Sequence, residues 1–279
     1  MRMVQTQTLE FGVLEQGTGP LALCLHGFPD SAHTWRHLLP ALAESGFHAV
    51  APFMRGYAPT ALARDGCYRL GALVADAVAL HEALGGDSDA VLIGHDWGAA
   101  AAFGACAFAP ERFSRLVALS VPPADLERRL FADYDQLKRF WYFFLLLTPF
   151  ASGVVDMELI ERWWRDWSPG YDPAEDLSLL APSISDPARL EAACAYYRAF
   201  ATPSDAFAAE TAARFKTAPQ PTLYLHGAKD RCIGLDVVHD VEQFLAPGSR
   251  MDVLDDAGHF LHLEQPDQVN GRIVEWVAS

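Results

Sequence analysis

The chain has 279 residues, of which 51% are hydrophobic and 20% charged, and this composition indicates one large globular domain with a substantial core. Its 36 acidic and 21 basic side chains give a formal net charge of -15 at pH 7, which argues against nucleic acid and anionic membranes as partners. The odd number of cysteines and their irregular spacing argue against a disulfide framework and a cysteine-based metal site. We interpret most of them as small buried apolar residues: Cys24, Cys67, Cys106, Cys194 and Cys232.

No segment of the sequence resembles a secretory signal or a membrane span. Residues 1–10 are polar and lack the basic region and the apolar region of a signal peptide. The most apolar stretch, residues 140–147, is shorter than the roughly 20 residues that cross a bilayer. We therefore expect a cytoplasmic protein with no membrane partner.

Short apolar runs alternate with helical patterns along most of the chain. This alternation is typical of a mostly parallel sheet with helices on both faces, and open sheets of this kind bind ligands at the carboxyl ends of their strands. The predicted strands are residues 21–25, 48–51, 90–93, 116–120, 222–225 and 251–254, and the predicted helices are residues 69–84, 97–108, 236–245 and 265–277.

Residues 123–218 interrupt the alternation. This interval has no clear strand and many aromatic side chains, and prolines stand at both of its ends, as expected of hinges around an insertion. We predict a helical cap over residues 123–218, inserted into a core made of residues 1–122 and 219–279. The aromatic side chains of the cap fit either a monomer whose pocket they line or a homodimer whose interface they form.

Asp96 lies at the centre of the sequence Gly94-His95-Asp96-Trp97-Gly98, between a predicted strand and an alanine-rich helix. This pattern is a nucleophile elbow, in which the glycines leave room for a sharp turn that exposes the central side chain. A serine in this position suits attack on acyl carbon. A carboxylate instead attacks an electrophilic sp3 carbon and forms an alkyl ester that water then cleaves. The elbow therefore favours the opening of an epoxide or a carbon–halogen bond.

Hydrolysis of such an ester requires a histidine base and an acidic partner, and both follow in the order nucleophile, acid, base. Asp230 comes just after the predicted strand 222–225, and His259 comes just after the last predicted strand. An aspartate in such a turn often only caps the next helix. The joint placement of Asp96, Asp230 and His259 favours a catalytic triad.

The sequence His26-Gly27-Phe28-Pro29 follows the predicted strand 21–25. We expect the backbone N–H groups of Phe28 and Trp97 to form an oxyanion hole for the tetrahedral intermediate, a contact worth roughly 3 to 4 kcal/mol per donor. His26 is interpreted as a structural residue that holds this turn by hydrogen bonds.

These motifs resemble the epoxide hydrolase group of the α/β-hydrolases over nearly the whole chain. The resemblance implies an α/β-hydrolase fold and two cap tyrosines that hydrogen-bond the epoxide oxygen. Tyr142 and Tyr197 match the two family tyrosines, although Tyr196 beside Tyr197 leaves the second position ambiguous. The resemblance also implies conversion of a hydrophobic epoxide and water to a vicinal diol without a metal or an organic cofactor. The residues expected to line the substrate pocket are Trp141, Phe144, Leu145, Phe150 and Trp163.

Two other functions remain open at this point. Haloalkane dehalogenases share the aspartate nucleophile and the following tryptophan, but they usually carry asparagine where Phe28 stands, and they lack the tyrosine pair. A catalytically inactive protein that binds a small ligand under the cap would keep the fold and could keep the triad. Metal binding through His259 and His262, or through residues 33–37, has no carboxylate or cysteine set at a recognisable spacing.

Overall fold

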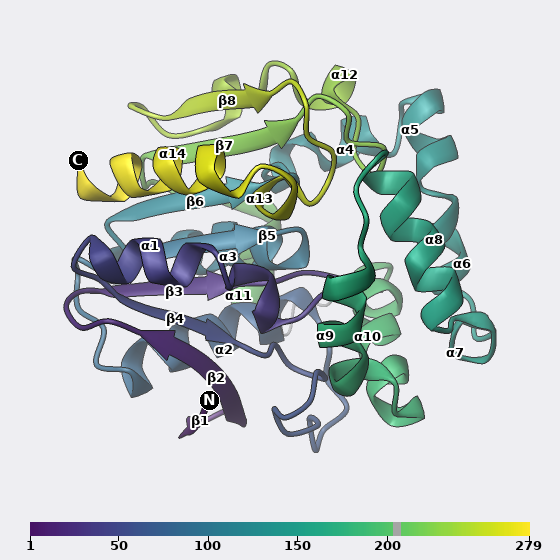
Figure 1. The fold of residues 1–279 in the computed structure, drawn as a ribbon, viewed down its shortest axis with the longest axis horizontal. Helices are drawn as coiled ribbons and strands as arrows, with labels where there is room; N and C mark the ends of the chain where they lie inside the picture. Colours follow the sequence, from purple (N-terminus) through teal and green to yellow (C-terminus); the bar gives the residue numbers. More distant parts are fainter. Residues whose placement is uncertain (203–207) are drawn as a thin grey trace.

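An eight-stranded sheet forms the centre of the computed structural model, which describes residues 1–202 and 208–279 (Figure 1). The strand order is β1-β2-β4-β3-β5-β6-β7-β8. β2 pairs antiparallel with both β1 and β4, whereas all neighbours from β4 to β8 are parallel. The strands are β1 (Arg2–Gln5), β2 (Glu10–Gln16), β3 (Leu21–Leu25), β4 (His48–Pro52), β5 (Val91–His95), β6 (Arg115–Leu119), β7 (Thr222–Gly227) and β8 (Arg250–Leu254).

The mostly parallel sheet expected from the sequence is confirmed, and its central strands show the reason. Every side chain of β3 and β5 is buried, as expected where helices cover both faces of a sheet. β1 and β2 were not predicted from the sequence. Three of the four residues of β1 are exposed at the edge of the sheet, so the sequence carries only a weak apolar signal there.

Helices cover the two faces of the sheet (Figure 1). On one face, α1 (Leu38–Glu44) packs against α14 (Pro266–Ala278), and on the other, α2 (Leu70–Ala83), α3 (Trp97–Phe108) and α11 (Ala208–Phe215) pack together. The single helix predicted at 236–245 is wrong. The structure has a short helix, α12 (Leu235–Val238), and a separate 3-10 turn, η4 (Val241–Phe244), because Asp240 leaves helical geometry and its carboxylate pairs with Arg129.

In the described part of the chain, seven helices lie over the carboxyl ends of the parallel strands, to the right in Figure 1. Several begin at a residue that suits a helix start: Asp156 and Asp186 accept hydrogen bonds from the first-turn N–H groups of their helices. The helices are α4 (Glu127–Leu130), α5 (Tyr134–Arg139), α6 (Trp141–Leu146), α7 (Ala151–Val154), α8 (Met157–Trp167), α9 (Ala174–Ile184) and α10 (Pro187–Phe200).

The last helix within the predicted cap, α11, packs against α2 and α3 on the sheet. A Cβ atom on Gly104 would lie 2.7 Å from the Cβ atom of Ala213, so α11 approaches α3 closely. We propose that α11 belongs with the core and that the cap ends before it. Residues 203–207 of the predicted cap lie outside the described residues.

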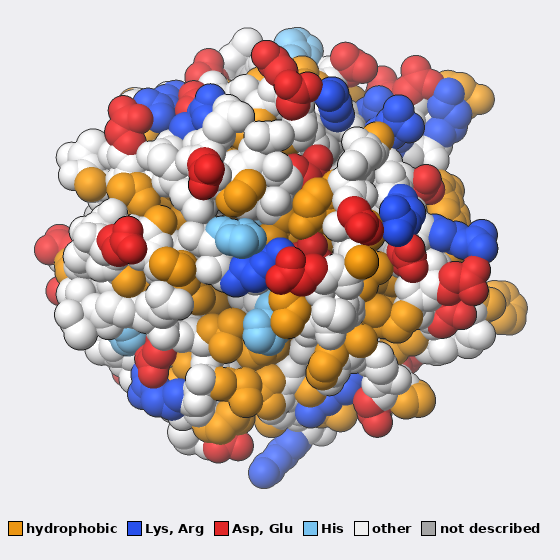
Figure 2. Space-filling view, viewed as in Figure 1, with side chains coloured by type: hydrophobic (Ala, Val, Ile, Leu, Met, Phe, Trp, Pro, Cys, Tyr) orange, Lys and Arg blue, Asp and Glu red, His pale blue; other side chains and the backbone are white. Residues whose placement is uncertain are grey.

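The described residues contain no helix with the length and apolar character needed to cross a membrane. On the face seen in Figure 2, acidic and basic side chains are interspersed with apolar ones.

Candidate active site

Asp96 occupies the turn between β5 and α3 with φ 51° and ψ -121°, a backbone conformation that few residues other than glycine adopt. The chain can make this turn only because the residues two positions away on either side, Gly94 and Gly98, lack side chains. A Cβ atom on Gly98 would lie 2.1 Å from the carbonyl oxygen of Leu25, and one on Gly94 would lie 2.3 Å from the carbonyl oxygen of Gly98. The turn holds the carboxylate of Asp96 beyond the end of the sheet.

Gly98→Ala is expected to lower the free energy of unfolding by about 1 to 3 kcal/mol, because its Cβ atom would overlap backbone that cannot yield without moving β3. Denaturant unfolding measures the loss. Gly271→Ala is the matched control, since Gly271 lies within α14 and its added Cβ atom would meet nothing within 4 Å. That change should stabilise the protein by about 0.5 to 1 kcal/mol. Equal stabilities of the two variants would contradict the packing argument.

The two carboxylate oxygens of Asp96 have different surroundings. Oδ1 accepts a hydrogen bond of 2.7 Å from the backbone N–H of Phe28, whereas Oδ2 lies 3.7 Å from Nε2 of His259. A Cβ atom on Gly27 would lie 2.3 Å from Oδ1, so this loop also approaches Asp96 closely. Among the described residues, no hydrogen bond joins the N–H of Trp97 to this carboxylate. Oδ2 is therefore the oxygen that is free to react.

His259 is held from its other side by Asp230. Nδ1 of His259 lies 2.9 Å from Oδ2 of Asp230, and both side chains are buried. Oδ1 of Asp230 accepts hydrogen bonds from the N–H groups of Cys232 and Ile233. Burial acts to raise the pKa of Asp230, but the adjoining His259 outweighs burial and leaves this pKa below its usual value. The ionised carboxylate of Asp230 accepts a hydrogen bond from Nδ1–H of His259. This bond orients the imidazole so that its other nitrogen, Nε2, faces Asp96.

The pKa of His259 is also displaced. Burial acts to lower it, but the carboxylates of Asp230 and Asp96 beside the ring raise it well above its usual value. The backbone of His259 is fixed as well: its N–H donates to the carbonyl of Trp167, and its carbonyl accepts from Ser120 Oγ at 2.7 Å and from His95 Nε2 at 2.9 Å. The contacts of Ser120 and Trp167 were not predicted from the sequence, because neither residue belongs to a recognisable motif.

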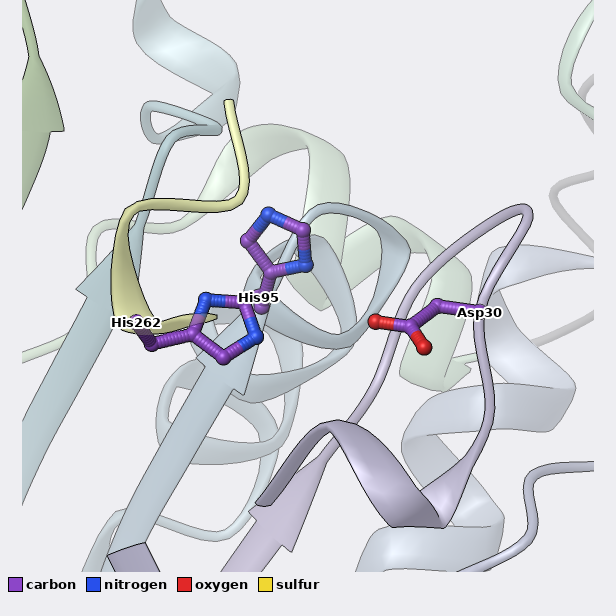
Figure 3. A group of neighbouring side chains, drawn as sticks. All are labelled: Asp30, His95 and His262. Carbon is purple, nitrogen blue, oxygen red and sulfur yellow. The ribbon is translucent and has the colours of Figure 1, made fainter. Parts of the chain in front are cut away.

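A group of three buried side chains lies behind His259, and Figure 3 shows the carboxyl group of Asp30 pointing toward the rings of His95 and His262. One atom from each side chain lies within 4.8 Å of the other two, and two imidazoles with a carboxylate are donors that suit a transition metal. His262 also contacts Thr34, with 2.5 Å between Nε2 and Oγ1. Because His95 bonds the carbonyl of His259, we assign this group a supporting role beneath the site.

His26 lies in the loop after β3 and is fully buried. Its Nε2 accepts a hydrogen bond of 2.9 Å from the N–H of Met54, and its Nδ1 lies 2.9 Å from the carbonyl oxygen of Gly27. Burial lowers the pKa of His26 to about 4, so the ring is neutral near pH 7. These contacts agree with the structural role predicted for His26.

A cavity of about 110 Å³ opens in front of Asp96, between the carboxyl ends of the strands and the helices above them. Its walls are mainly apolar and aromatic. Besides Asp96 and Trp97, the lining includes Val121, Leu130, Phe131, Phe140, Tyr142, Phe143, Tyr197 and Phe200.

The five residues expected to line the pocket do not line this cavity, and the direction of each side chain explains why. Within α6, Tyr142 and Phe143 face the cavity, whereas Trp141 and Phe144 are 48% and 43% exposed. All six residues of α6 are aromatic or aliphatic, so hydrophobicity alone does not reveal which face of this helix is buried. The pocket prediction is therefore wrong for all five: Trp141, Phe144 and Phe150 are exposed, Leu145 is half-buried, and Trp163 is buried against Tyr142 and Trp167.

Two tyrosines of the helices above the strand ends face the cavity, Tyr142 from α6 and Tyr197 from α10. Their ring centroids are 6.0 Å apart. Tyr196 turns away and donates its hydroxyl to the carbonyl oxygen of Arg55 at 2.6 Å, so Tyr197 is the one of the adjacent pair that reaches the cavity. Burial raises the pKa of Tyr142 and of Tyr197 well above the usual value, which keeps both hydroxyls protonated and able to donate hydrogen bonds.

Comparisons with known families, sequences and structures all find relatives of the same kind. Residues 22–272 match the alpha/beta hydrolase family. The whole chain is 28% identical to Epoxide hydrolase A of Mycobacterium tuberculosis, of which 97% is covered. It is 30% identical to Epoxide hydrolase 4 of Mus musculus over 91% of this chain and 72% of that protein. A crystal structure of an epoxide hydrolase from Bacillus megaterium in complex with an inhibitor matches the fold with a TM-score of 0.82 at 24% identity, over 100% of both chains.

Proposed function

Because the chain belongs to the epoxide hydrolases of the α/β hydrolase family, we propose that it opens a hydrophobic epoxide to a vicinal diol through an ester on Asp96. The observation that carries this proposal is the placement of the Asp96 carboxylate. It faces an apolar cavity, its Oδ1 is bonded to Phe28, and its Oδ2 lies 3.7 Å from His259. A carboxylate held in this way suits attack on an sp3 carbon.

In the proposed first step, Oδ2 of Asp96 attacks one epoxide carbon and the carbon–oxygen bond of the ring breaks. The electron pair of that bond moves to the epoxide oxygen, which must receive a proton or a strong hydrogen bond. Tyr142 and Tyr197 line the cavity, and we assign their hydroxyls as the donors of this hydrogen bond or proton. The product of this step is a hydroxyalkyl ester of Asp96.

In the second step, Nε2 of His259 removes a proton from water, and the resulting hydroxide adds to the carbonyl carbon of the ester. The negative charge develops on Oδ1, which the N–H of Phe28 already bonds, and we assign the N–H of Trp97 as the second donor. When this intermediate collapses, the bond between the carbonyl carbon and Oδ2 breaks, and the diol leaves with the proton that His259 took from water. Conversion of Asp96 to a neutral ester removes one of the anions that raise the pKa of His259. The imidazole therefore becomes available as a base at the stage that needs one.

Tyr142→Phe and Tyr197→Phe are each expected to slow formation of the ester by about 10- to 100-fold, the value of one hydrogen bond to a developing charge. Single-turnover stopped-flow fluorescence measures this step. Tyr196→Phe is the matched control, because the Tyr196 hydroxyl bonds Arg55 rather than facing the cavity. If ester formation in Tyr142→Phe and Tyr197→Phe were as fast as in the wild type, the two tyrosines would have no part in ring opening.

The experiment that tests the reaction itself is a single turnover with enzyme in excess over an aromatic epoxide in ¹⁸O-labelled water. The ester mechanism transfers an unlabelled oxygen from Asp96 to the first diol and leaves the label in the protein. Direct attack by water would instead place the label in the diol. Parallel incubation with a 1-haloalkane separates the alternatives: halide release would indicate a dehalogenase, and no product from either substrate would indicate a binding protein.

Two further properties belong to this proposal. The described chain supplies the whole proposed site by itself, which supports a catalytically sufficient monomer, although a homodimer is compatible with it. The five cysteines are all unpaired, which supports a location in the reducing cytoplasm.

A further inference from the structure

Cys232 lies in the loop after β7, two residues beyond Asp230, and its side chain is 1% exposed. Its Sγ atom lies 3.2 Å from the hydroxyl oxygen of Tyr142, a residue 90 positions earlier in the chain. The backbone holds the thiol in place, since the N–H of Cys232 donates a hydrogen bond of 2.7 Å to Oδ1 of Asp230. The triad carboxylate therefore fixes the loop that carries this thiol.

The direction of the bond between Cys232 and Tyr142 matters for the reaction. A tyrosine hydroxyl has one proton to donate, and a proton directed at sulfur would not be directed at the epoxide. Sulfur is a weak hydrogen-bond acceptor and the S–H group a weak donor, whereas the hydroxyl oxygen of tyrosine is the better acceptor of the two atoms. Burial raises the pKa of Cys232, so this thiol keeps its proton. The favoured arrangement is a bond from the S–H group to the oxygen of Tyr142.

We propose that Cys232 is a positioning residue that donates its thiol proton to the hydroxyl oxygen of Tyr142 and so directs the Tyr142 O–H at the epoxide oxygen. This inference rests on the proposed function. As the ring opens, negative charge spreads from the epoxide oxygen to the Tyr142 oxygen, and the S–H bond stabilises that charge as well. The thiol neither reacts with the substrate nor changes its own protonation state.

If Cys232 served only to fill space, its replacement by valine would have a different effect from the one proposed here. Valine fills nearly the same space as cysteine but has no proton to donate. Cys232→Val would then be harmless, or it would slow every step by disturbing the loop of Asp230. A positioning role acts only through the Tyr142 hydroxyl. Loss of the thiol proton should therefore slow ester formation and leave ester hydrolysis unchanged, because hydrolysis uses His259 and not Tyr142.

The test is a double-mutant cycle on Cys232→Val, Tyr142→Phe and the double variant, with Cys232→Ser as the conservative replacement. Stopped-flow fluorescence of the intact enzyme with an aromatic epoxide gives the rates of ester formation and ester hydrolysis separately; Trp167 lies 4.6 Å from Tyr142 between ring centroids and is one reporter. We expect Cys232→Val to slow ester formation about three- to tenfold, as for the loss of one neutral hydrogen bond. Cys232→Ser should stay within about twofold of the wild type, since a hydroxyl also donates.

In the Tyr142→Phe background, Cys232→Val should have no further effect on ester formation. The inference is overturned if the valine variant matches the wild type, if it slows the Tyr142→Phe enzyme by the same factor, or if ester hydrolysis slows instead. Equal losses for Cys232→Ser and Cys232→Val would also overturn it. Thermal unfolding identifies a variant that has lost its fold, and Cys232→Ala then replaces Cys232→Val. A wild-type enzyme that forms no ester with any epoxide would reject the proposed function, whereas an active wild type with unaffected Cys232 variants would reject only this inference.

Discussion

Asp96→Ala is expected to lower epoxide turnover by at least about 10,000-fold, because the variant has no nucleophile to form the ester and the remaining groups cannot replace it. Among the residues that the structure describes, Glu127 is the other acidic residue of the cavity lining, and its carboxylate is paired with Arg214, with 3.7 Å between the two charged groups. Chromatography of the diol product under saturating epoxide measures the loss.

Asp96→Asn is the matched control, because it removes the nucleophilic carboxylate but keeps the volume and the short polar character of the side chain at this turn. Both variants should remain folded, as judged by thermal unfolding and circular dichroism. Turnover by a folded Asp96→Ala enzyme at more than about one hundredth of the wild-type rate would contradict the ester mechanism, because that mechanism has no nucleophile other than Oδ2 for the first step.

His259→Gln is expected to stop the reaction at the ester. Ring opening uses Asp96 and the two tyrosines, whereas activation of water needs the imidazole, so only the second step should slow, by about 1,000-fold or more. Intact-protein mass spectrometry of this variant mixed with styrene oxide should show one adduct per chain with the full mass of the epoxide. Peptide mapping should place that adduct on Asp96.

The matched control is the double variant Asp96→Asn with His259→Gln, which should form no adduct. An adduct at another residue would show that Asp96 is not the nucleophile. With a 1-haloalkane in place of the epoxide, an alkyl adduct that has lost halide would move the assignment to dehalogenation. Full turnover by His259→Gln would mean that another group activates the water.

The strands and helices that were predicted from the sequence are those with long apolar runs or clear helical spacing. β3 and β5 are examples, since each lies buried between two layers of helices. β1 lies at the edge of the sheet and buries only one of its four residues, so it gives a weak apolar signal. β2 lies between β1 and β4 but buries only Phe11, Gly12 and Val13 of its seven residues, so it has no long apolar run either. The break at Asp240 depends on Arg129, a residue more than a hundred positions away.

The arrangement around Asp96 was largely predictable because local chemistry determines it. Glycines at both ends of the elbow, and a turn directly after a strand, leave few positions for the nucleophile, whatever the rest of the chain does. Asp230 and His259 follow other parallel strands, and the carboxyl ends of those strands meet at one edge of the sheet. Sequence order and strand direction were sufficient to predict that these three side chains lie together.

The walls of the cavity, by contrast, were decided only by the tertiary structure. α6 is apolar on every side, so only its packing against the neighbouring helices selects Tyr142 and Phe143 for the cavity and turns Trp141 outward. The same holds for the bond between Cys232 and Tyr142, which joins the loop after β7 to α6 across 90 residues of sequence. Strand ends and glycine turns obey rules that act over a few residues, whereas the face that a uniformly apolar helix buries depends on the shape of the surface it meets.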